Sequence, residues 1–224
     1  MRYASGKRAF DVAGAGILLA ILLPVLLAIL ALVAATGGSP LYGHARVGRG
    51  GRVFRCWKVR TMAPDADARL ASLLRASPVL AAEWARDHKL RDDPRVTPFG
   101  RLLRPLFLDE IPQLWNVIVG DMSLVGPRPV TRTELARYGR SARYYRAMRP
   151  GLTGLWQIEG RGEVGYRRRV AFDRYYVTRA GLGIDLALML RTPLALRHGT
   201  VAAGVGAAEG DMLRPGIVRK GKAR

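Results

Sequence analysis

The hydrophobic pattern of the chain changes abruptly after about its first 35 residues. No charged side chain occurs in residues 12 to 35, VAGAGILLAILLPVLLAILALVAA. At about 1.5 Å per residue, a straight helix of that length would cross a bilayer core of about 30 Å. A cleaved signal peptide is the alternative, because a peptidase could cut beside Ala34 and Ala35, but its apolar core usually has only about 7 to 15 residues. The pattern therefore favours a membrane segment.

The flanking charges bear on the topology of this segment. Arg2, Lys7 and Arg8 precede it, and residues 36 to 60 contain basic but no acidic side chains. Because basic residues favour the cytoplasmic side, both ends are expected there, which a straight span does not allow. Pro24, in the middle of the run, removes a backbone hydrogen bond and predicts a kink that returns the chain to the same side. An ordinary span that tolerates the proline is the alternative.

Beyond residue 36 the apolar runs are shorter and their spacing predicts mostly helices. A β-like stretch is expected over 52–62, and helices from Pro64 to about Leu90 with an interruption at Ser77-Pro78. Thr97 is expected to cap a short basic helix that ends before Pro105. The next helix is predicted over 109–120, with two acidic residues and Pro112 in its first turn and Gly120 at its end.

Two more helices are predicted within residues 163–196, where apolar faces alternate with Arg and Tyr. These faces could lie in a membrane interface or pack in the core. The turns at 122–130 and 149–162 are expected to be loops, because proline and glycine punctuate them. The sequence thus predicts an α+β fold that is mostly α, with a short β-hairpin, a membrane segment over 1–36, a compact domain over 37–200 and a basic flexible tail over 201–224.

The composition limits the chemical classes of partner that the protein is expected to bind. Lys plus Arg number 37 against 17 Asp plus Glu, a formal net charge of +20, which indicates an anionic partner such as nucleic acid, an acidic membrane surface or a phosphorylated substrate. Cys56 is the only cysteine, so an internal disulfide and a CxxC metal site are excluded, and it is predicted to be a packing residue. The three histidines lack metal-ligand spacing, and neither a P-loop nor a GxGxxG motif occurs.

Asp109 and Glu110 stand side by side in the apolar stretch LFLDEIPQLW of this basic chain. Neighbouring helical residues diverge by about 100°, so the pair would serve two adjacent tasks rather than act as a matched dyad. A helix N-terminus keeps carboxylates ionised, and an ionised carboxylate can attack phosphorus or hold Mg²⁺. Helix capping alone is the alternative.

Basic residues surround the acidic pair along the sequence. Arg101 and Arg104 precede it, and Arg128 lies in GPRP, a rigid turn that suits two-pronged recognition of phosphate. Lys58 and Arg60 add cations upstream. Carboxylates, a divalent ion and several phosphate-binding cations together predict phosphoryl transfer.

The chain resembles the bacterial polyprenyl-phosphate sugar-1-phosphate transferases, the small monotopic phosphoglycosyl transferases. The resemblance runs from KRAFDV (7–12) to FDRYYV (172–177), and its most specific stretch is LDEIPQLWNVIVGDMSLVGPRP (108–129). RVGRGGRVFRCWKVRTM and RPGLTGLWQIEGRG support it independently.

This resemblance implies transfer of a sugar 1-phosphate from a UDP-sugar to a polyprenyl (undecaprenyl) phosphate, with Mg²⁺ as cofactor and UMP released. It implies a covalent phosphosugar intermediate on Asp109, assisted by Glu110 through metal binding or by tuning the aspartate. Arg104 and Arg128 would hold phosphate or nucleotide groups. Lys58, Arg60 and Arg161 match binding residues of the family less specifically. The family's N-terminal helix is re-entrant and broken at a proline often preceded by serine, whereas Leu23 precedes Pro24 in this chain.

The resemblance also implies a bacterial inner-membrane protein with its catalytic domain on the cytoplasmic face, in contact with membrane lipids, with no nucleic acid as partner and compatible with a homo-oligomer. Two other classes compete with it. A membrane-tethered nucleic-acid-binding protein would explain the net charge, but no helix-turn-helix, RRM or zinc module is recognisable. A non-catalytic scaffold of a polysaccharide assembly complex would have no physical need of Asp109, Glu110 and Arg128.

Overall fold

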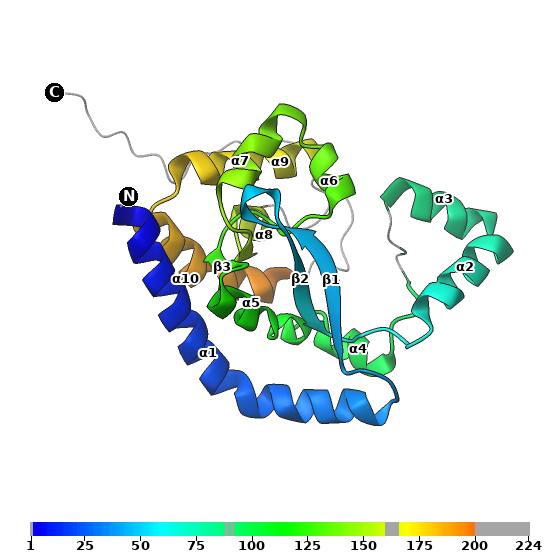
Figure 1. Cartoon of the computed structure of the whole chain (residues 1–224). Helices are drawn as coiled ribbons and strands as arrows, with labels where there is room; N and C mark the ends of the chain where they lie inside the picture. Colours follow the sequence, from blue (N-terminus) through cyan, green and yellow to red (C-terminus); the bar gives the residue numbers. More distant parts are fainter. Residues whose placement is uncertain (1, 88–89, 91, 160–165, 200–224) are drawn as a thin grey trace.

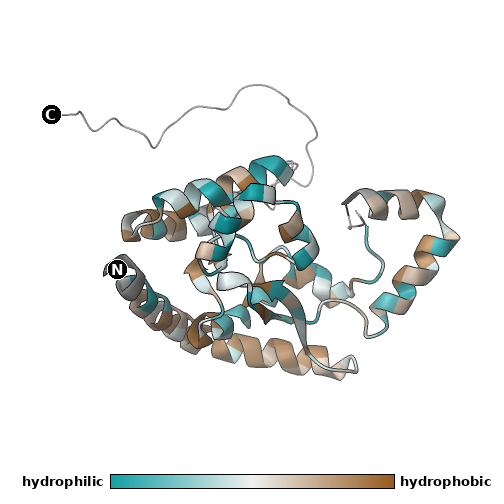
Figure 2. Cartoon of the chain, turned by 45° about the horizontal axis from the view of Figure 1, so that its top comes forward, coloured by the Kyte–Doolittle hydropathy of each residue, from teal (hydrophilic) through white to brown (hydrophobic). Residues whose placement is uncertain are grey.

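The computed structural model describes residues 2–87, 90, 92–159 and 166–199 (Figure 1). Its first element, α1 (Arg2–Ala35), is a helix with Pro24 inside it, and Gly6–Ala35 is apolar and long enough to cross a membrane. Figure 1 shows that α1 changes direction about halfway along its length, as the loss of a backbone hydrogen bond at a proline predicts. Apolar residues dominate α1 beyond its first turns (Figure 2).

The predicted β-hairpin follows. Strands β1 (Leu41–Val47) and β2 (Val53–Val59) pair antiparallel from Leu41↔Val59 to Val47↔Val53, joined by the 3-10 turn η1 (Arg49–Gly51). Along β2, buried Phe54 and Cys56 alternate with exposed neighbours, so one face of the hairpin covers the core. The packing role predicted for Cys56 is confirmed, because its sulfur lies 4.0 Å from that of Met122 in the core.

Three helices predicted from periodicity come next. α2 (Ala66–Ala76) and α3 (Pro78–Asp87) form a helical hairpin that projects from the rest of the molecule (Figure 1). α4 (Pro98–Leu103) begins as expected, with the Thr97 side chain accepting a hydrogen bond from the Gly100 backbone at 2.9 Å. A Cβ at Gly100 would lie 2.2 Å from the Thr61 carbonyl oxygen, so only glycine lets α4 approach the end of the hairpin this closely.

The helix predicted over 109–120 is shorter than expected. Leu108–Glu110 forms a 3-10 turn, η2, and α5 begins at Gln113 after Pro112 and ends at Val119, with Gly120 in the left-handed conformation. Asp109 and Glu110 therefore precede α5 instead of occupying its first turn. The reason is Phe107, whose positive φ of 57° turns the chain sharply after α4 and leaves room for only one tight turn.

The regions expected to be loops contain short strands. β3 (Ser123–Val125) and β4 (Gly151–Thr153) pair in parallel, with Ser123 opposite Gly151. A Cβ on Gly126 would lie 2.5 Å from the Arg149 carbonyl oxygen, so the glycine that suggests a loop instead permits close contact between the two segments. The remaining elements are α6 (Arg132–Ala136), η3 (Gly139–Ser141), α7 (Ala142–Ala147), α8 (Leu155–Glu159), α9 (Tyr166–Arg179) and α10 (Leu182–Gly199).

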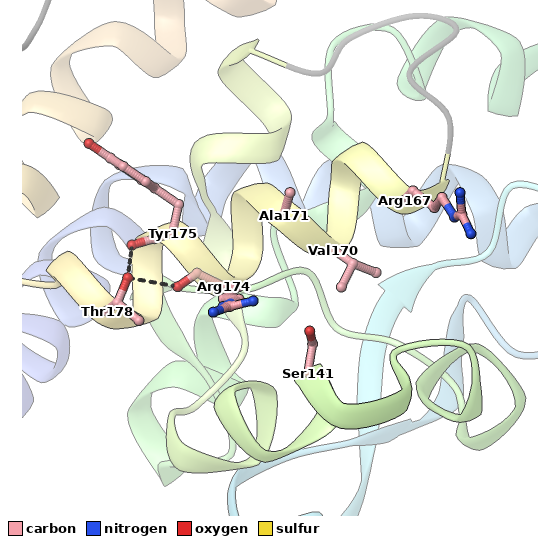
Figure 3. A pocket seen from close by; sticks show the side chains of 7 residues that line it. All are labelled: Ser141, Arg167, Val170, Ala171, Arg174, Tyr175 and Thr178. Carbon is pink, nitrogen blue, oxygen red and sulfur yellow. Dashed lines mark hydrogen bonds between the residues drawn. The ribbon is translucent and has the colours of Figure 1, made fainter.

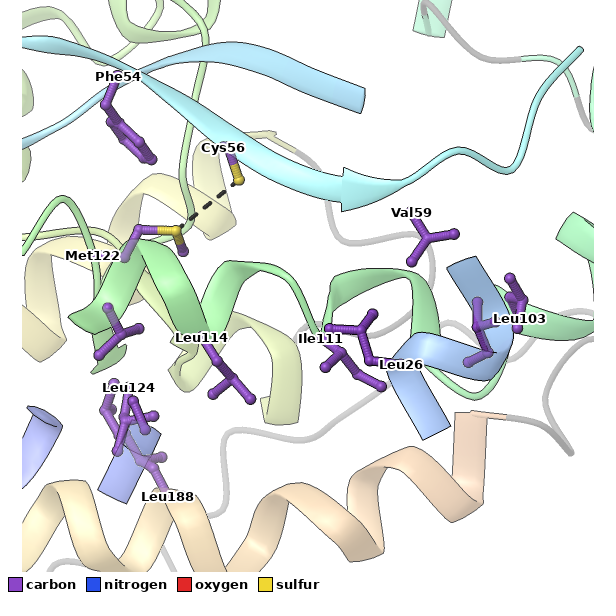
Figure 4. Packing of buried hydrophobic residues seen from close by; sticks show 14 of the residues in the cluster. Leu26, Phe54, Cys56, Val59, Leu103, Ile111, Leu114, Met122, Leu124 and Leu188 are labelled. Atoms are coloured by element: carbon purple, nitrogen blue, oxygen red, sulfur yellow. Dashed lines mark hydrogen bonds between the residues drawn. The ribbon is translucent and has the colours of Figure 1, made fainter. Parts of the chain in front are cut away.

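The main core joins α1 to the rest of the molecule. One side of α1 supplies Leu26, Ile29 and Val33, which share a cluster with residues of β2, α4, α5, β3 and α10 (Figure 4). A smaller cluster around Tyr138 and Tyr145 lies between the hairpin, α6 and α7. The mostly helical fold with a small hairpin is confirmed, and α1 is packed against α5 rather than held apart.

Candidate active site

The turn that carries the acidic pair is anchored by its apolar neighbours. Leu103 and Ile111 are buried in the main core and Leu108 packs against it, on either side of Asp109. The 3-10 turn is closed by the Glu110 backbone N–H, which donates to the Phe107 carbonyl oxygen at 3.0 Å. The apolar stretch around the two carboxylates thus fixes them on a rigid, buried turn.

Two cations, Lys58 and Arg104, lie near this turn. The Lys58 ammonium, at the end of β2, lies 2.5 Å from a carboxylate oxygen of Glu110. Burial raises the pKa of Asp109, and the charges of Lys58 and Arg104 act against that rise. Arg104, just after α4, is itself half-buried and its Nε donates to the Thr61 hydroxyl at 2.9 Å. Lys58, Arg104, Asp109 and Glu110, four of the predicted site residues, are therefore brought together.

Asn116 holds the two sides of the site in register, and sequence reasoning missed it. Its buried side chain accepts from the Trp57 backbone N–H at 3.0 Å and donates to the Arg55 carbonyl oxygen at 2.8 Å. Because these two hydrogen bonds clamp α5 to β2, they set Lys58 opposite Glu110. A buried amide on the first turns of a predicted apolar helix is the signal that could have identified it.

Arg128 lies in a turn that hydrogen bonds hold on both sides. The Gly126 N–H donates to the Thr153 carbonyl oxygen at 2.9 Å, and the Gly151 N–H donates to that of Pro127 at 2.8 Å. The Arg128 guanidinium carbon lies 4.4 Å from the ring centre of Trp156. Burial and the charge of Arg169 lower the pKa of Arg128, and within the described part of the chain its Nε is buried without a hydrogen-bond partner.

Asp173, on α9, is hydrogen-bonded to the Arg128 turn and was not singled out from the sequence. Its carboxylate is 3% exposed, accepts from the Tyr138 hydroxyl at 2.7 Å and is hydrogen-bonded to the backbone of Arg128. Burial raises its pKa to about 7. The detectable signal is a carboxylate on the apolar side of a predicted amphipathic helix.

Two of the weaker predictions fall elsewhere. The Arg60 guanidinium donates to the Val33 carbonyl oxygen and the Thr36 hydroxyl, both at 3.0 Å, at the end of α1. Its contacts therefore tie the hairpin to α1 and do not bring it to the acidic pair. Arg161 lies outside the described residues.

The carboxylates fit a magnesium ion that a substrate would help to coordinate. No group of three or more His, Cys, Asp or Glu side chains with metal-binding geometry occurs among the residues that the structure describes. Mg²⁺, however, is commonly held by one or two carboxylates together with substrate phosphates and water. Asp109 and Glu110 supply that minimal set of hard oxygen donors.

A cavity of about 350 Å³ lies between α9 and η3 and is separate from these groups (Figure 3). Arg167, Arg174 and Ser141 line it, and the Thr178 hydroxyl at its edge donates to the carbonyl oxygens of Arg174 and Tyr175. None of its lining residues belongs to the predicted site.

Comparison with known proteins agrees with the geometry. The family model of the bacterial sugar transferases matches residues 2–199. Over 187 residues, or 83% of each chain, the sequence is 49% identical to the exopolysaccharide production protein ExoY of Sinorhizobium fredii. It is 49% identical over 186 residues to a UDP-galactose-lipid carrier transferase of Erwinia amylovora. It is 46% identical over 186 residues to an undecaprenyl-phosphate galactose phosphotransferase of Salmonella typhimurium. These last two matches cover 83% of this chain, which spans only 39% of each relative.

Proposed function

Because the chain belongs to the bacterial sugar transferase family, we propose that it moves a sugar 1-phosphate from a UDP-sugar to a polyprenyl phosphate, undecaprenyl phosphate in bacteria, and releases UMP. The observation that carries this proposal is the buried Asp109, which lies within electrostatic reach of Lys58 and Arg104. The names of two relatives make UDP-galactose the first donor to test.

In the proposed first step, an Asp109 carboxylate oxygen attacks the phosphorus that carries the sugar. A bond forms between this oxygen and phosphorus, and the bond from phosphorus to the bridging oxygen breaks, so that UMP leaves with the electron pair. In the second step an oxygen of the polyprenyl phosphate attacks the same phosphorus and releases the carboxylate. Division into two steps avoids direct contact between two anionic substrates in a site of low polarity.

The surrounding cations would stabilise the charge that moves during both steps. Arg104 and Lys58 lie beside the carboxylates, and Arg128 presents a planar fork suited to phosphate oxygens. Glu110 would be released from Lys58 when phosphate competes for the ammonium. A bound Mg²⁺, held by Asp109 and Glu110, would supply further charge neutralisation on the phosphates.

A lipid acceptor requires a site at membrane level, and the surface supports this location. Large apolar side chains are exposed on α1, on α4, α5 and the segment between them, and on α10, among them Leu27, Leu102, Leu106, Trp115, Val119 and Leu190. Such faces suit helices that lie in a membrane interface. We place α1 in the bacterial inner membrane as a re-entrant helix and the rest of the chain on the cytoplasmic face.

The test is release of UMP by the purified full-length protein supplied with Mg²⁺, UDP-galactose or another UDP-sugar, and undecaprenyl phosphate. Asp109→Asn is expected to lower turnover at least 1000-fold, because the amide is a poor nucleophile. Asp121→Asn is a matched control, since Asp121 is a carboxylate ion-paired with Arg52 outside the site, and it should stay within about twofold of the unmodified protein. Normal turnover by Asp109→Asn would reject the covalent role.

A further inference from the structure

Arg128 carries a largely buried guanidinium that forms no ion pair with an acidic side chain in the described part of the chain, and its Nε lacks a hydrogen-bond partner there. The acidic groups whose charge reaches it are Glu134, Glu110 and Asp173, and the Asp173 carboxyl accepts from the Tyr138 hydroxyl. Glu134 already accepts from Arg46 Nη1 at 2.9 Å and from a backbone N–H, and Glu110 accepts from Lys58 at 2.5 Å. A buried charge without an ion-pair partner is costly, so the guanidinium is suited to an anionic ligand.

A second cation shares this environment. The Arg169 guanidinium, from α9, also lies over the Trp156 ring, 5.2 Å from its centre, and its charge acts on Arg128. The Trp156 indole N–H is buried, and no acceptor for it exists among the described residues. Two guanidinium groups from separate segments thus lie over one indole, whose own N–H is a third donor. The attraction of cations to the ring offsets only part of the repulsion between the guanidinium groups.

We propose that Arg128, Arg169 and Trp156 form one pocket for the diphosphate of the nucleotide donor, in which Arg169 holds the phosphate that leaves with UMP. This assignment rests on the proposed function. Arg128 is within electrostatic reach of Glu110, the neighbour of the proposed nucleophile, and Arg169 reaches the same ring from α9. We therefore assign Arg128 to the phosphate that is attacked and Arg169 to the phosphate that departs. UMP keeps this phosphate and should therefore bind to Arg169.

The experiment measures UMP binding by calorimetry on the full-length protein in lipid nanodiscs, together with the steady-state constants for both substrates. Arg169→Gln is expected to raise the Kd of UMP and the KM of the UDP-sugar at least tenfold and to leave the KM of undecaprenyl phosphate within twofold. Trp156→Phe keeps an aromatic ring and removes the indole N–H, and it should raise the Kd of UMP at least threefold. Arg168→Gln is the matched control, because Arg168 is the neighbouring exposed arginine and lies over Phe172 instead. It should leave UMP binding within twofold.

Unchanged UMP binding by Arg169→Gln, or an equal loss with Arg168→Gln, would overturn the proposal. Should Arg169→Gln fail to fold, Arg169→Lys replaces it, since it keeps the charge and loses the planar fork. A lysine variant that binds UMP as well as the unmodified protein would likewise overturn it. Loss of UMP binding in Arg169→Gln, when the unmodified protein binds UMP but transfers no sugar, would support the pocket and reject the proposed function.

Discussion

Asp173 illustrates how a residue remote from the reacting groups can organise the site. It contacts both the backbone at Arg128 and the Tyr138 hydroxyl, which lies 35 residues away in sequence. Both contacts fix the position of the GPRP turn, and with it the guanidinium that the turn presents. Its buried carboxyl also has a consequence for stability that can be measured.

Asp173 should make the stability of the folded protein depend on pH. Its pKa is raised to about 7 in the folded state by burial, against 3.8 for an unperturbed aspartate. Between these values the folded protein holds a proton that the unfolded chain lacks, so the free energy of unfolding falls as pH rises from about 4 to 7. Asp173→Asn removes this dependence. The melting temperature of the variant minus that of the unmodified protein should therefore increase by about 5 °C or more between about pH 4 and pH 7.

The control for this pH series is Asp67→Asn, because Asp67 is an exposed carboxylate in the first turn of α2. Its melting temperature should follow that of the unmodified protein at every pH. A constant difference between Asp173→Asn and the unmodified protein from pH 4 to 7 would show that the carboxyl does not take up a proton on folding.

At the residue scale, sequence reasoning identifies groups of polar residues that are neighbours in the chain. Asp109 and Glu110 form a local motif, and the structure brings Lys58 and Arg104 to them. Asn116 and Asp173 were missed because their partners lie 35 to 61 residues away and leave no local pattern. The direction in which a side chain leaves a strand end is equally hidden from the sequence, and Arg60 instead binds the end of α1.

At the scale of elements, hydrophobic periodicity predicts the longer helices and the hairpin correctly. The three-residue strands β3 and β4 escape it, because three residues are too few to show an alternating pattern and each strand is stabilised by a partner 28 residues away. The start of α5 was placed too early because acidic residues and a proline resemble a first helical turn. The preceding helix already ends at Leu103, and the left-handed Phe107 instead begins a separate 3-10 turn.

The bend of α1 leads to a prediction about topology at this scale. If the helix is re-entrant, single cysteines placed near residues 4 and 45 should react with a membrane-impermeant maleimide from the same side of sealed vesicles. The native Cys56 should not react with the maleimide, because it is buried and burial raises the pKa of its thiol to about 11. Labelling from opposite sides would establish a full span. Pro24→Leu, which restores the helix hydrogen bond, is expected to shift residue 4 toward the opposite side.

At the scale of the whole molecule, a buried charge network joins α1 to the strand that leads into the Arg128 turn. The Lys7 ammonium lies 2.9 Å from Asp185 and 3.3 Å from Asp11, at the start of α1. Asp11 accepts from the backbone N–H of Leu124 in β3, the strand that leads into the Arg128 turn. Tyr176, on α9, donates to Asp185 on α10 at 2.6 Å. One network therefore connects α1, β3, α9 and α10.

The network predicts that stability and catalysis are coupled through α1. Asp185→Asn leaves Lys7 buried with only one carboxylate, and loss of one partner from a buried ion pair typically costs about 3 to 5 kcal/mol. The variant should melt at a lower temperature and show reduced kcat, since β3 loses the support that holds the Arg128 turn.

A double-mutant cycle tests the coupling between Lys7 and Asp185. The double variant Lys7→Gln, Asp185→Asn should be destabilised by at least about 1 kcal/mol less than the sum of the two single changes, because the groups interact directly. The same cycle on the exposed Arg52–Asp121 pair should give less than that. Additive effects at Lys7 and Asp185 would mean that their ion pair does not couple α1 to α10, and α1 would then be held by apolar packing and by other contacts such as those of Arg8 with α5.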